Sequence, residues 1–110
     1  MSHETMTGDQ LLRMLSALAN PHRLRIVAAL ADGRNYVSQL ARDMGMSRPL
    51  LHMHLQRLEA AGLITGALEM SESGKAMKYF EVAPFDFELS AATVAALVPT
   101  LTEDNEKAGK

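Results

Sequence analysis

Apolar residues recur at helical spacing along most of the chain, and cap signals divide this pattern into separate helices. Apolar positions three or four residues apart form the buried face of an amphipathic helix. Thr7 with Gln10 three residues later fits a capping box, so we predict that the first helix starts there. Asn20 followed by Pro21 is the next start signal, an N-cap side chain with proline at the first helical position. The pattern therefore predicts two helices before Gly33.

The third and fourth helices are predicted to be short and close together. An apolar stripe runs from Val37 to Met44 and is followed by Gly45, a typical helix stop. Ser47 can cap the next helix, and Pro49 is tolerated in its first turn, where no backbone donor is needed. Two short helices joined by a glycine-containing turn of about four residues form a helix-turn-helix, although packed helix pairs also occur in unrelated folds.

The composition changes after Gly62 from helical to strand-forming. Residues 63–65 and 77–82 have strand-like content, and residues 71–75 between them form a turn-rich tip. A β-hairpin directly after the second helix of a helix-turn-helix is a wing. The order of elements therefore predicts a winged helix-turn-helix.

A last helix is predicted after the hairpin. Ser90 can cap this helix, and its apolar stripe includes Pro99, which should kink or shorten it. The fold class is therefore mainly α with a small β-hairpin (α+β), in the order α-α-α-α-β-β-α. We expect the domain to span residues 7–102, between a flexible N-terminus of residues 1–6 and a flexible acidic tail of residues 103–110.

Length and composition fit one domain of this kind. The chain has 110 residues and no cysteine, which excludes disulfides, thiolate metal sites and cysteine nucleophiles. No apolar run approaches the roughly 18 residues that span a bilayer, and the polar start lacks the features of a signal peptide. We therefore expect a cytoplasmic protein with no membrane partner.

The charged residues are unevenly distributed. The net charge is −2, yet residues 20–60 carry six arginines against three acids, and residues 81–110 carry six acids against two lysines. Phosphate contacts depend on the local field, so a basic middle and an acidic end are compatible with nucleic-acid binding. An ordinary mixed surface explains the charges equally well, and charge alone does not decide between the two.

Three stretches of the sequence resemble the ArsR/SmtB transcriptional regulators. Residues 18–26 (LANPHRLRI) are similar to the family's L-x-D-P-x-R-L-x-I run, and residues 47–64 are similar to its S-x-x-x-x-S-x-H-L-x-x-L-x-x-A-G-L-V run. The phrase at residues 74–79 resembles members with a longer wing than the metal-sensing prototypes. Such Ala-rich, long-winged sequences resemble actinobacterial or archaeal members, which include a nickel-responsive regulator of superoxide dismutase expression.

The resemblance implies a sequence-specific DNA-binding regulator. Such a protein acts as a homodimer on a palindromic operator of double-stranded DNA, with the fourth helix in the major groove. The first and last helices would form the dimer interface, which suits a small domain that cannot bury both apolar stripes alone. The residues expected there are Leu11, Leu12, Leu15, Val94, Leu97, Val98 and Leu101.

The fourth helix carries most of the candidate DNA contacts. At about 100° per residue, Leu51, Leu55 and Leu58 lie on one face, and the opposite face holds Pro49, His52, Met53, Gln56 and Arg57. Arg48 lies at the helix start and can bind a phosphate or a guanine edge, whereas Gln56 can pair with adenine and Met53 can touch a thymine methyl. The full candidate set is Ser47, Arg48, Pro49, His52, Met53, His54, Gln56 and Arg57 on the helix, with Lys75 and Lys78 as phosphate contacts on the wing.

Two histidines of this helix need separate interpretation. His52 and His54 point about 200° apart, so they cannot chelate one ion. His54 borders the apolar face and matches the family's histidine, which leaves a structural role, a backbone contact and direct base reading open. His52 stands where the family usually has a small hydroxyl residue, so its base contact is in doubt.

The family's metal sites are not matched. Many relatives bind metal through a C-x-C motif on the third helix, where this chain has Tyr36 and Ser38, and others use histidines of the last helix, which has none here. No cofactor is therefore certain. One arrangement could still hold Cu(II) or Ni(II): His3 with the terminal amine of Met1, or of Ser2 if Met1 is removed. A histidine near the start by chance is the alternative.

Two other functions compete with DNA binding. A winged helix can serve as a protein-interaction module without reading DNA, and insensitivity of its binding to salt would favour that role. The sequence has no phosphate-binding glycine loop, no H-E-x-x-H motif and no nucleophile–base arrangement. We therefore do not expect an enzyme.

Overall fold

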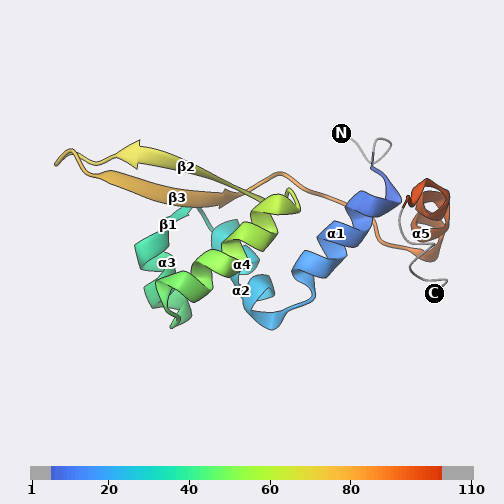
Figure 1. Ribbon diagram of the computed structural model, residues 1–110, viewed down its shortest axis with the longest axis horizontal. Helices are drawn as coiled ribbons and strands as arrows, with labels where there is room; N and C mark the ends of the chain where they lie inside the picture. Colours follow the sequence, from blue (N-terminus) through green and yellow to red (C-terminus); the bar gives the residue numbers. More distant parts are fainter. Residues whose placement is uncertain (1–5, 103–110) are drawn as a thin grey trace.

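The elements follow the predicted order of helices, hairpin and last helix (Figure 1). The structure is a computed structural model that describes residues 6–102. It confirms the predicted fold class, a mainly helical winged helix-turn-helix with a small antiparallel sheet. The elements are α1 (Gly8–Leu18), α2 (Pro21–Ala31), β1 (Asn35–Tyr36), α3 (Val37–Met44), α4 (Arg48–Ala60), β2 (Ile64–Met70), β3 (Ala76–Val82), α5 (Ala91–Leu97) and the 3-10 turn η2 (Val98–Thr100).

Side-chain caps fix where the helices begin, as the sequence predicts. Thr7 and Gln10 form the capping box of α1, in which each side chain accepts a hydrogen bond from the other's backbone N–H. The Asn20 side chain accepts from two backbone N–H groups at the start of α2. Ser47 accepts from the backbone N–H of Leu50 at 3.3 Å and so caps α4.

The turn between α3 and α4 depends on Gly45. This residue has φ +66°, a left-handed conformation that side chains other than glycine rarely adopt. Its N–H bonds to the carbonyl of Arg42, and the next N–H, of Met46, bonds to the carbonyl of Ala41. This closure of α3 directs the chain into α4 within two residues.

The sheet is larger than the sequence predicts. β2 and β3 pair antiparallel over seven residues each, from Ile64 opposite Val82 to Met70 opposite Ala76. The two-residue strand β1 pairs with the other edge of β3 and gives the order β1-β3-β2. A two-residue strand carries no alternation that a sequence pattern could reveal, so β1 is an addition to the predicted order.

The core lies between the helices and the base of the sheet. Leu51, Leu55 and Leu58 of α4 are fully buried, which confirms the predicted inner face of that helix. They pack in one cluster with Ile26 of α2 and Phe80 of β3. This packing holds α4 rigidly, with its opposite face turned outward.

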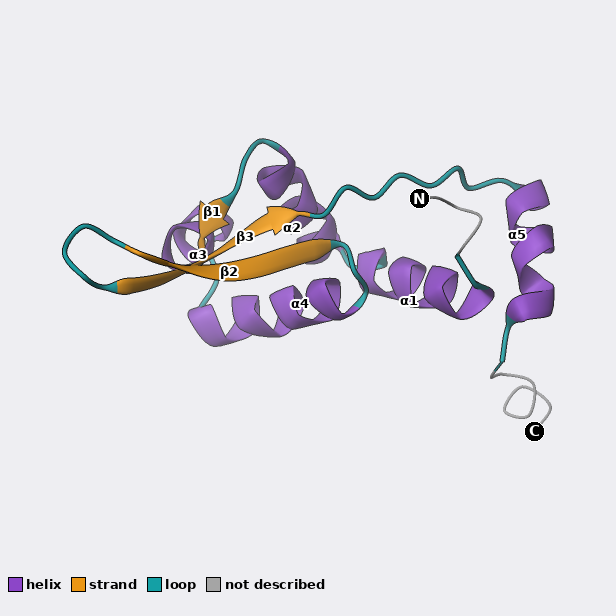
Figure 2. Cartoon of the chain, turned by 90° about the horizontal axis from the view of Figure 1, so that it is seen from above, coloured by secondary structure: helices purple, strands orange, loops and turns teal. Residues whose placement is uncertain are grey.

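The C-terminal elements fold back onto the start of α1. Pro99 ends α5 early and forms part of η2, as predicted for a proline inside the stripe. The backbone N–H of Gly8 donates to Thr100 at 2.6 Å, and the backbone N–H of Thr102 donates to Asp9 at 3.1 Å. α5 therefore lies at one end of the molecule, beyond α1 and far from the wing (Figures 1 and 2).

Some expectations concern residues outside the described range. His3, most of the predicted N-terminal segment and the acidic tail 103–110 belong to this part. Within residues 6–102, every helix is too short or too polar to cross a lipid bilayer.

Candidate nucleic-acid interface

The outward face of α4 carries the predicted recognition residues. Seven of the eight predicted residues on this helix and its cap are exposed: Ser47, Arg48, Pro49, His52, Met53, Gln56 and Arg57. Leu50 joins them with 40% of its surface exposed, although it was not among the predicted contacts. The buried leucines on the other side leave this face free for a partner.

His54 lies apart from that face, in the core. Only 3% of its surface is exposed, and its Nδ1 accepts a hydrogen bond of 3.1 Å from Nε of Arg23 on α2. Burial, followed by the charges of Arg23 and His22, lowers the pKa of His54 below its usual value of 6.5. Of the three roles left open for His54, this position fits the structural one. The neutral imidazole accepts a hydrogen bond from Arg23 of α2.

The start of α4 and the wing share one hollow. Arg48 from α4 lines it with Lys75 and Lys78 of the hairpin. The rest of its wall is formed by residues 36–38 and by Ala76 and Met77. The residues that line the hollow include no acid. The fold thus brings Arg48 next to two lysines that come much later in the sequence, and we call this place the basic hollow. Its positive charge suits a phosphate group.

A polar and aromatic cluster fixes the wing beside the helices. The Tyr36 hydroxyl donates to Glu69 at 2.6 Å, and the Arg34 guanidinium bonds to the same carboxylate at 3.2 Å. Arg34 also stacks over the Tyr79 ring at 4.1 Å. The hydrogen bond from Tyr36, with the nearby charge of Arg34, lowers the pKa of Glu69. These contacts join β1 to the hairpin and set where the wing lies relative to α4.

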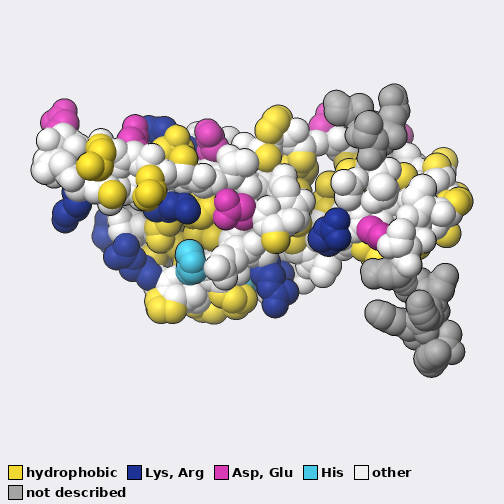
Figure 3. Space-filling view, turned by 45° about the horizontal axis from the view of Figure 1, so that its top comes forward, with side chains coloured by type: hydrophobic (Ala, Val, Ile, Leu, Met, Phe, Trp, Pro, Cys, Tyr) yellow, Lys and Arg dark blue, Asp and Glu magenta, His cyan; other side chains and the backbone are white. Residues whose placement is uncertain are grey.

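Basic side chains form a row across one face of the molecule. Figure 3 shows Lys and Arg groups from the hairpin across the helix-turn-helix towards α1, with hydrophobic, uncharged and a few acidic side chains among them. The net charge of −2 therefore does not describe this face.

The comparisons with known proteins agree on one family. The model described as "Bacterial regulatory protein, arsR family" matches residues 20–65. A homodimeric winged helix-turn-helix DNA-binding domain from Mycobacterium bovis, described as a possible ArsR-family regulator, has a TM-score of 0.62 and 31% identity over 81% of this chain and 71% of that one. The chain belongs to the ArsR family.

Curated relatives of this ArsR-family chain include CmtR of Mycobacterium tuberculosis, with 38% identity over 67% of this chain. The match spans 59% of the length of CmtR. An uncharacterized HTH-type transcriptional regulator from Methanocaldococcus jannaschii is 29% identical over 78% of this chain and 90% of its own length. Both relatives are named as HTH-type transcriptional regulators. Their names give no support to the nickel-responsive specificity expected from the long wing.

Metal ligands do not gather in the described part of this ArsR-family chain. Residues 6–102 contain no group of three or more His, Cys, Asp or Glu side chains that could hold an ion. Tyr36 and Ser38, at the places of the family's cysteines, contribute instead to the wall of the basic hollow. The one predicted metal ligand, His3, lies outside the described residues.

The predicted dimer residues line one apolar groove between α1 and α5. Leu12 and Val98 on its walls keep 49% and 51% of their surfaces exposed, whereas Leu11 is buried. All seven predicted residues take part, and Gly8 is the one further member: Gly8, Leu11, Leu12, Leu15, Val94, Leu97, Val98 and Leu101. The described part of the chain leaves this groove uncovered.

Two residues near the interface were missed by the sequence reasoning. Arg13 on α1 and Arg23 on α2 border a pocket with Arg57 of α4. Arg23 belongs to the LANPHRLRI stretch and Arg13 shares α1 with Asp9, but no local spacing relates either arginine to α4. Only the packing of the three helices brings them together.

Proposed function

We propose that this chain is a sequence-specific DNA-binding transcriptional regulator of the cytoplasm, acting as a homodimer on a palindromic operator. The observation that carries the proposal is the basic hollow, in which Arg48 of α4 and Lys75 and Lys78 of the wing converge. It adjoins an exposed helix face whose opposite side is locked into the core. Such a helix can enter the major groove of DNA while the wing contacts the backbone.

Several exposed residues of α4 and its cap have a chemical role in this proposal. Arg48 donates to a guanine edge or a phosphate, Gln56 pairs with adenine and Met53 packs on a thymine methyl. Ser47 and the first backbone N–H groups of α4 favour a phosphate because the helix dipole is positive there. Lys75 and Lys78 bind phosphates and carry no sequence information.

A homodimer is supported by the apolar groove and by a relative. The M. bovis domain is described as homodimeric, and the α1–α5 groove here exposes leucine and valine side chains that a second copy would cover. Two copies related by a twofold axis present two recognition helices, which suits a palindromic operator.

DNA selection on the purified protein tests this function. We expect enrichment of an inverted repeat whose half-sites lie about one helical turn, roughly 34 Å, apart. Affinity should fall steeply with salt, because phosphate contacts release counterions. Binding to a protein partner with no salt dependence, and no enriched DNA, would instead support the interaction-module alternative.

Arg48→Ala tests the reading residue itself. Loss of a bidentate guanine contact should cost about 1–3 kcal/mol and relax selection at one base position, whereas loss of a phosphate contact weakens all sequences alike. Arg25→Ala, which removes an exposed arginine of α2 outside the basic hollow, is the matched control. Operator affinity equal to that of the wild type would remove Arg48 from the interface.

The metal hypothesis rests on His3 alone. We propose that Ni(II) or Cu(II), if it modulates DNA binding, is held by His3 and the terminal amine of Met1 or Ser2. Calorimetric titration of Ni(II) into wild type and His3→Ala decides this, and selection with and without Ni(II), Zn(II) and chelator reports any effect on DNA. Identical isotherms would exclude the N-terminal site.

A further inference from the structure

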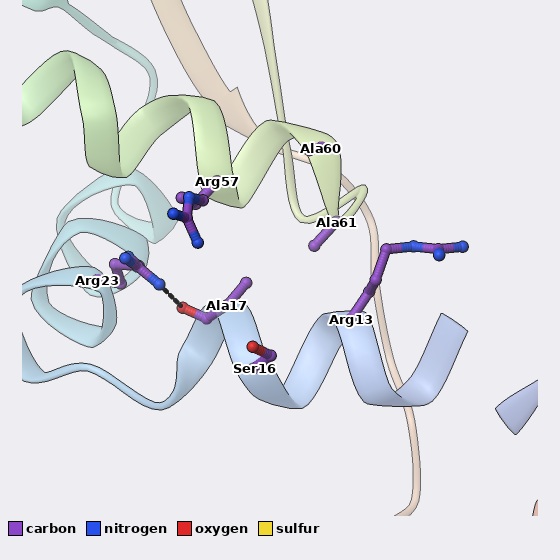
Figure 4. A pocket seen from close by; sticks show the side chains of 7 residues that line it. All are labelled: Arg13, Ser16, Ala17, Arg23, Arg57, Ala60 and Ala61. Atoms are coloured by element: carbon purple, nitrogen blue, oxygen red, sulfur yellow. Dashed lines mark hydrogen bonds between the residues drawn. The ribbon is translucent and has the colours of Figure 1, made fainter. Parts of the chain in front are cut away.

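A second basic cluster lies at the other end of α4. Arg13 of α1, Arg23 of α2 and Arg57 of α4 line a pocket of about 160 Å³, completed by Ser16, Ala17, Ala60 and Ala61. Figure 4 shows Arg23 and Arg57 reaching into the space between the three helices, whereas Arg13 stands at the rim and points outward. We call this place the arginine pocket.

Arg23 is held in position at the pocket. Its Nε donates to Nδ1 of buried His54 at 3.1 Å, and its Nη1 approaches the carbonyl of Ala17 at 3.5 Å (Figure 4). An arginine has five N–H donors in a planar fork, so these two bonds leave three directed elsewhere. Arg23 is therefore a preorganised donor for a further acceptor.

Among the described residues no acid lines the arginine pocket, although the Arg13 charge at its rim is close enough to Asp9 of α1 to help lower the pKa of that carboxyl. The ion pair found in residues 6–102 joins Arg34 and Glu69, which lie outside the arginine pocket. No acid lines the pocket, and the Ser16 hydroxyl adds a neutral donor. Guanidinium groups that share a small space repel one another, and an anion between them removes that cost.

We propose that the arginine pocket binds a phosphate group. The forked guanidinium groups of Arg23 and Arg57 suit two oxygens of a tetrahedral oxyanion, and Arg13 can turn inward from the rim. The phosphate can come from the DNA backbone or from a free phosphate compound. A DNA source rests on the proposed function, whereas a free phosphate does not.

The position of the pocket along α4 favours DNA as the source. Arg48 and Arg57 are nine residues apart, about 14 Å along the helix axis at 1.5 Å per residue. The major groove is roughly 12 Å wide, so a helix lying in it can meet backbone phosphates on both sides. The basic hollow would bind one strand and the arginine pocket the other.

The pocket shares no residue with the groove of the proposed dimer. Arg13 is two residues from both Leu11 and Leu15, so it is turned about 160° from each around α1. The apolar groove contains both leucines, whereas the pocket contains Arg13. Arg23 and Arg57 lie on α2 and α4, which contribute no residue to the groove, so a second copy that covers the groove need not cover these two arginines.

Titration with inorganic phosphate tests the site without DNA. We expect saturable NMR shifts of the Arg23 Nε–H and of the amides of Ala17 and Ala61. Affinity should fall at least tenfold in Arg57→Gln, an exposed position that can change without loss of the fold, and in Arg23→Gln. Arg25→Gln removes the same charge from α2 outside the pocket and should bind like the wild type.

Salt dependence of DNA affinity tests the other source. Arg13→Gln and Arg57→Gln should each weaken binding to all sequences alike and reduce the slope of log K against log salt by about one, whereas Arg25→Gln should not. If the pocket variants weaken only the binding of inorganic phosphate, the site takes a free phosphate compound. If they change only DNA affinity and its salt slope, the site takes a backbone phosphate of DNA. If the pocket variants match Arg25→Gln in both measurements, the proposal is wrong. If the wild type binds no DNA, the proposed function fails and the phosphate titration still decides the site.

Discussion

His54 links α4 to α2. It is buried on α4, its ring lies 5.5 Å from that of His22, and it accepts a hydrogen bond from Arg23 on α2. A charged imidazole at this place would lose hydration and face a guanidinium group, so the fold favours the neutral form. The same residue therefore supports the core and orients an arginine at the surface.

The stability of the fold should depend on the titration of His54. Because the pKa of His54 is lower in the folded chain, the unfolded chain binds more protons as pH falls through about 6.5, and stability decreases. Urea unfolding from about pH 7.5 to about pH 5.5 should show a smaller loss in His54→Gln than in the wild type. At neutral pH this variant should be destabilised by about 1–2 kcal/mol. His52→Gln, at an exposed position, should keep the wild-type slope, and an unchanged slope in His54→Gln would contradict the role of His54.

For single residues, the sequence predicted on which side of a helix a side chain lies but not which distant residue it contacts. Helical spacing placed His54 at the border of the apolar face and His52 outside it, and the structure buries His54 and exposes His52. The bond to Arg23 spans 31 residues and depends on how two helices pack. Local spacing contains no such information, so the sequence left the role of His54 open.

Among the elements, the hairpin depends on close packing at Gly66. This residue pairs with Phe80 across the strands, and a Cβ atom at Gly66 would lie 2.6 Å from Cε1 of that ring. Glycine is a poor strand former, and the sequence accordingly predicted a strand only to Thr65. The buried ring takes the space that a side chain would fill, and the strand continues to Met70.

Gly66→Ala should destabilise the domain, although alanine normally suits a strand better than glycine. The added methyl group must displace the buried ring of Phe80, so we expect a loss of about 1–3 kcal/mol in the free energy of unfolding. Ala67→Ser changes the adjacent, exposed position of the same strand and should shift stability by less than about 0.5 kcal/mol. Equal stability of the two variants in urea unfolding would mean that the ring moves freely.

The helices were easier to predict from sequence than the sheet. Caps at Thr7, Asn20, Ser47 and Ser90 are local signals, and each helix begins where its cap predicts. β1 exists because Asn35–Tyr36 meets β3, with Tyr36 anchored to a glutamate 33 residues away. A two-residue strand that forms through pairing with a distant strand shows no alternation of apolar and polar residues in the sequence.

The whole molecule is more extended than a compact domain of its size. Its radius of gyration is 16.4 Å, against about 13 Å for a compact chain of 100 residues, and its extents are 53 × 31 × 20 Å. α5 and η2 lie at one end, and the groove they form with α1 is apolar and open. The seven predicted dimer residues line this groove. They form apolar helix faces that the core of one small domain does not cover. The hydrogen bonds that seat η2 on Gly8 and Asp9 were not predictable from spacing.

Leu12→Glu should separate the proposed dimer without unfolding the protomer. Half of this side chain is exposed in the groove, so the substitution leaves the core intact but would place a carboxylate in the interface. We expect the dimer dissociation constant to rise at least tenfold in sedimentation equilibrium, with an unchanged helical circular dichroism spectrum. Affinity for the full inverted repeat should fall while binding to an isolated half-site persists, because each protomer keeps its own α4 and wing. Leu24→Glu, at a similarly exposed leucine outside the groove, should stay dimeric, and equal behaviour of the two variants would mean that copies associate through another surface.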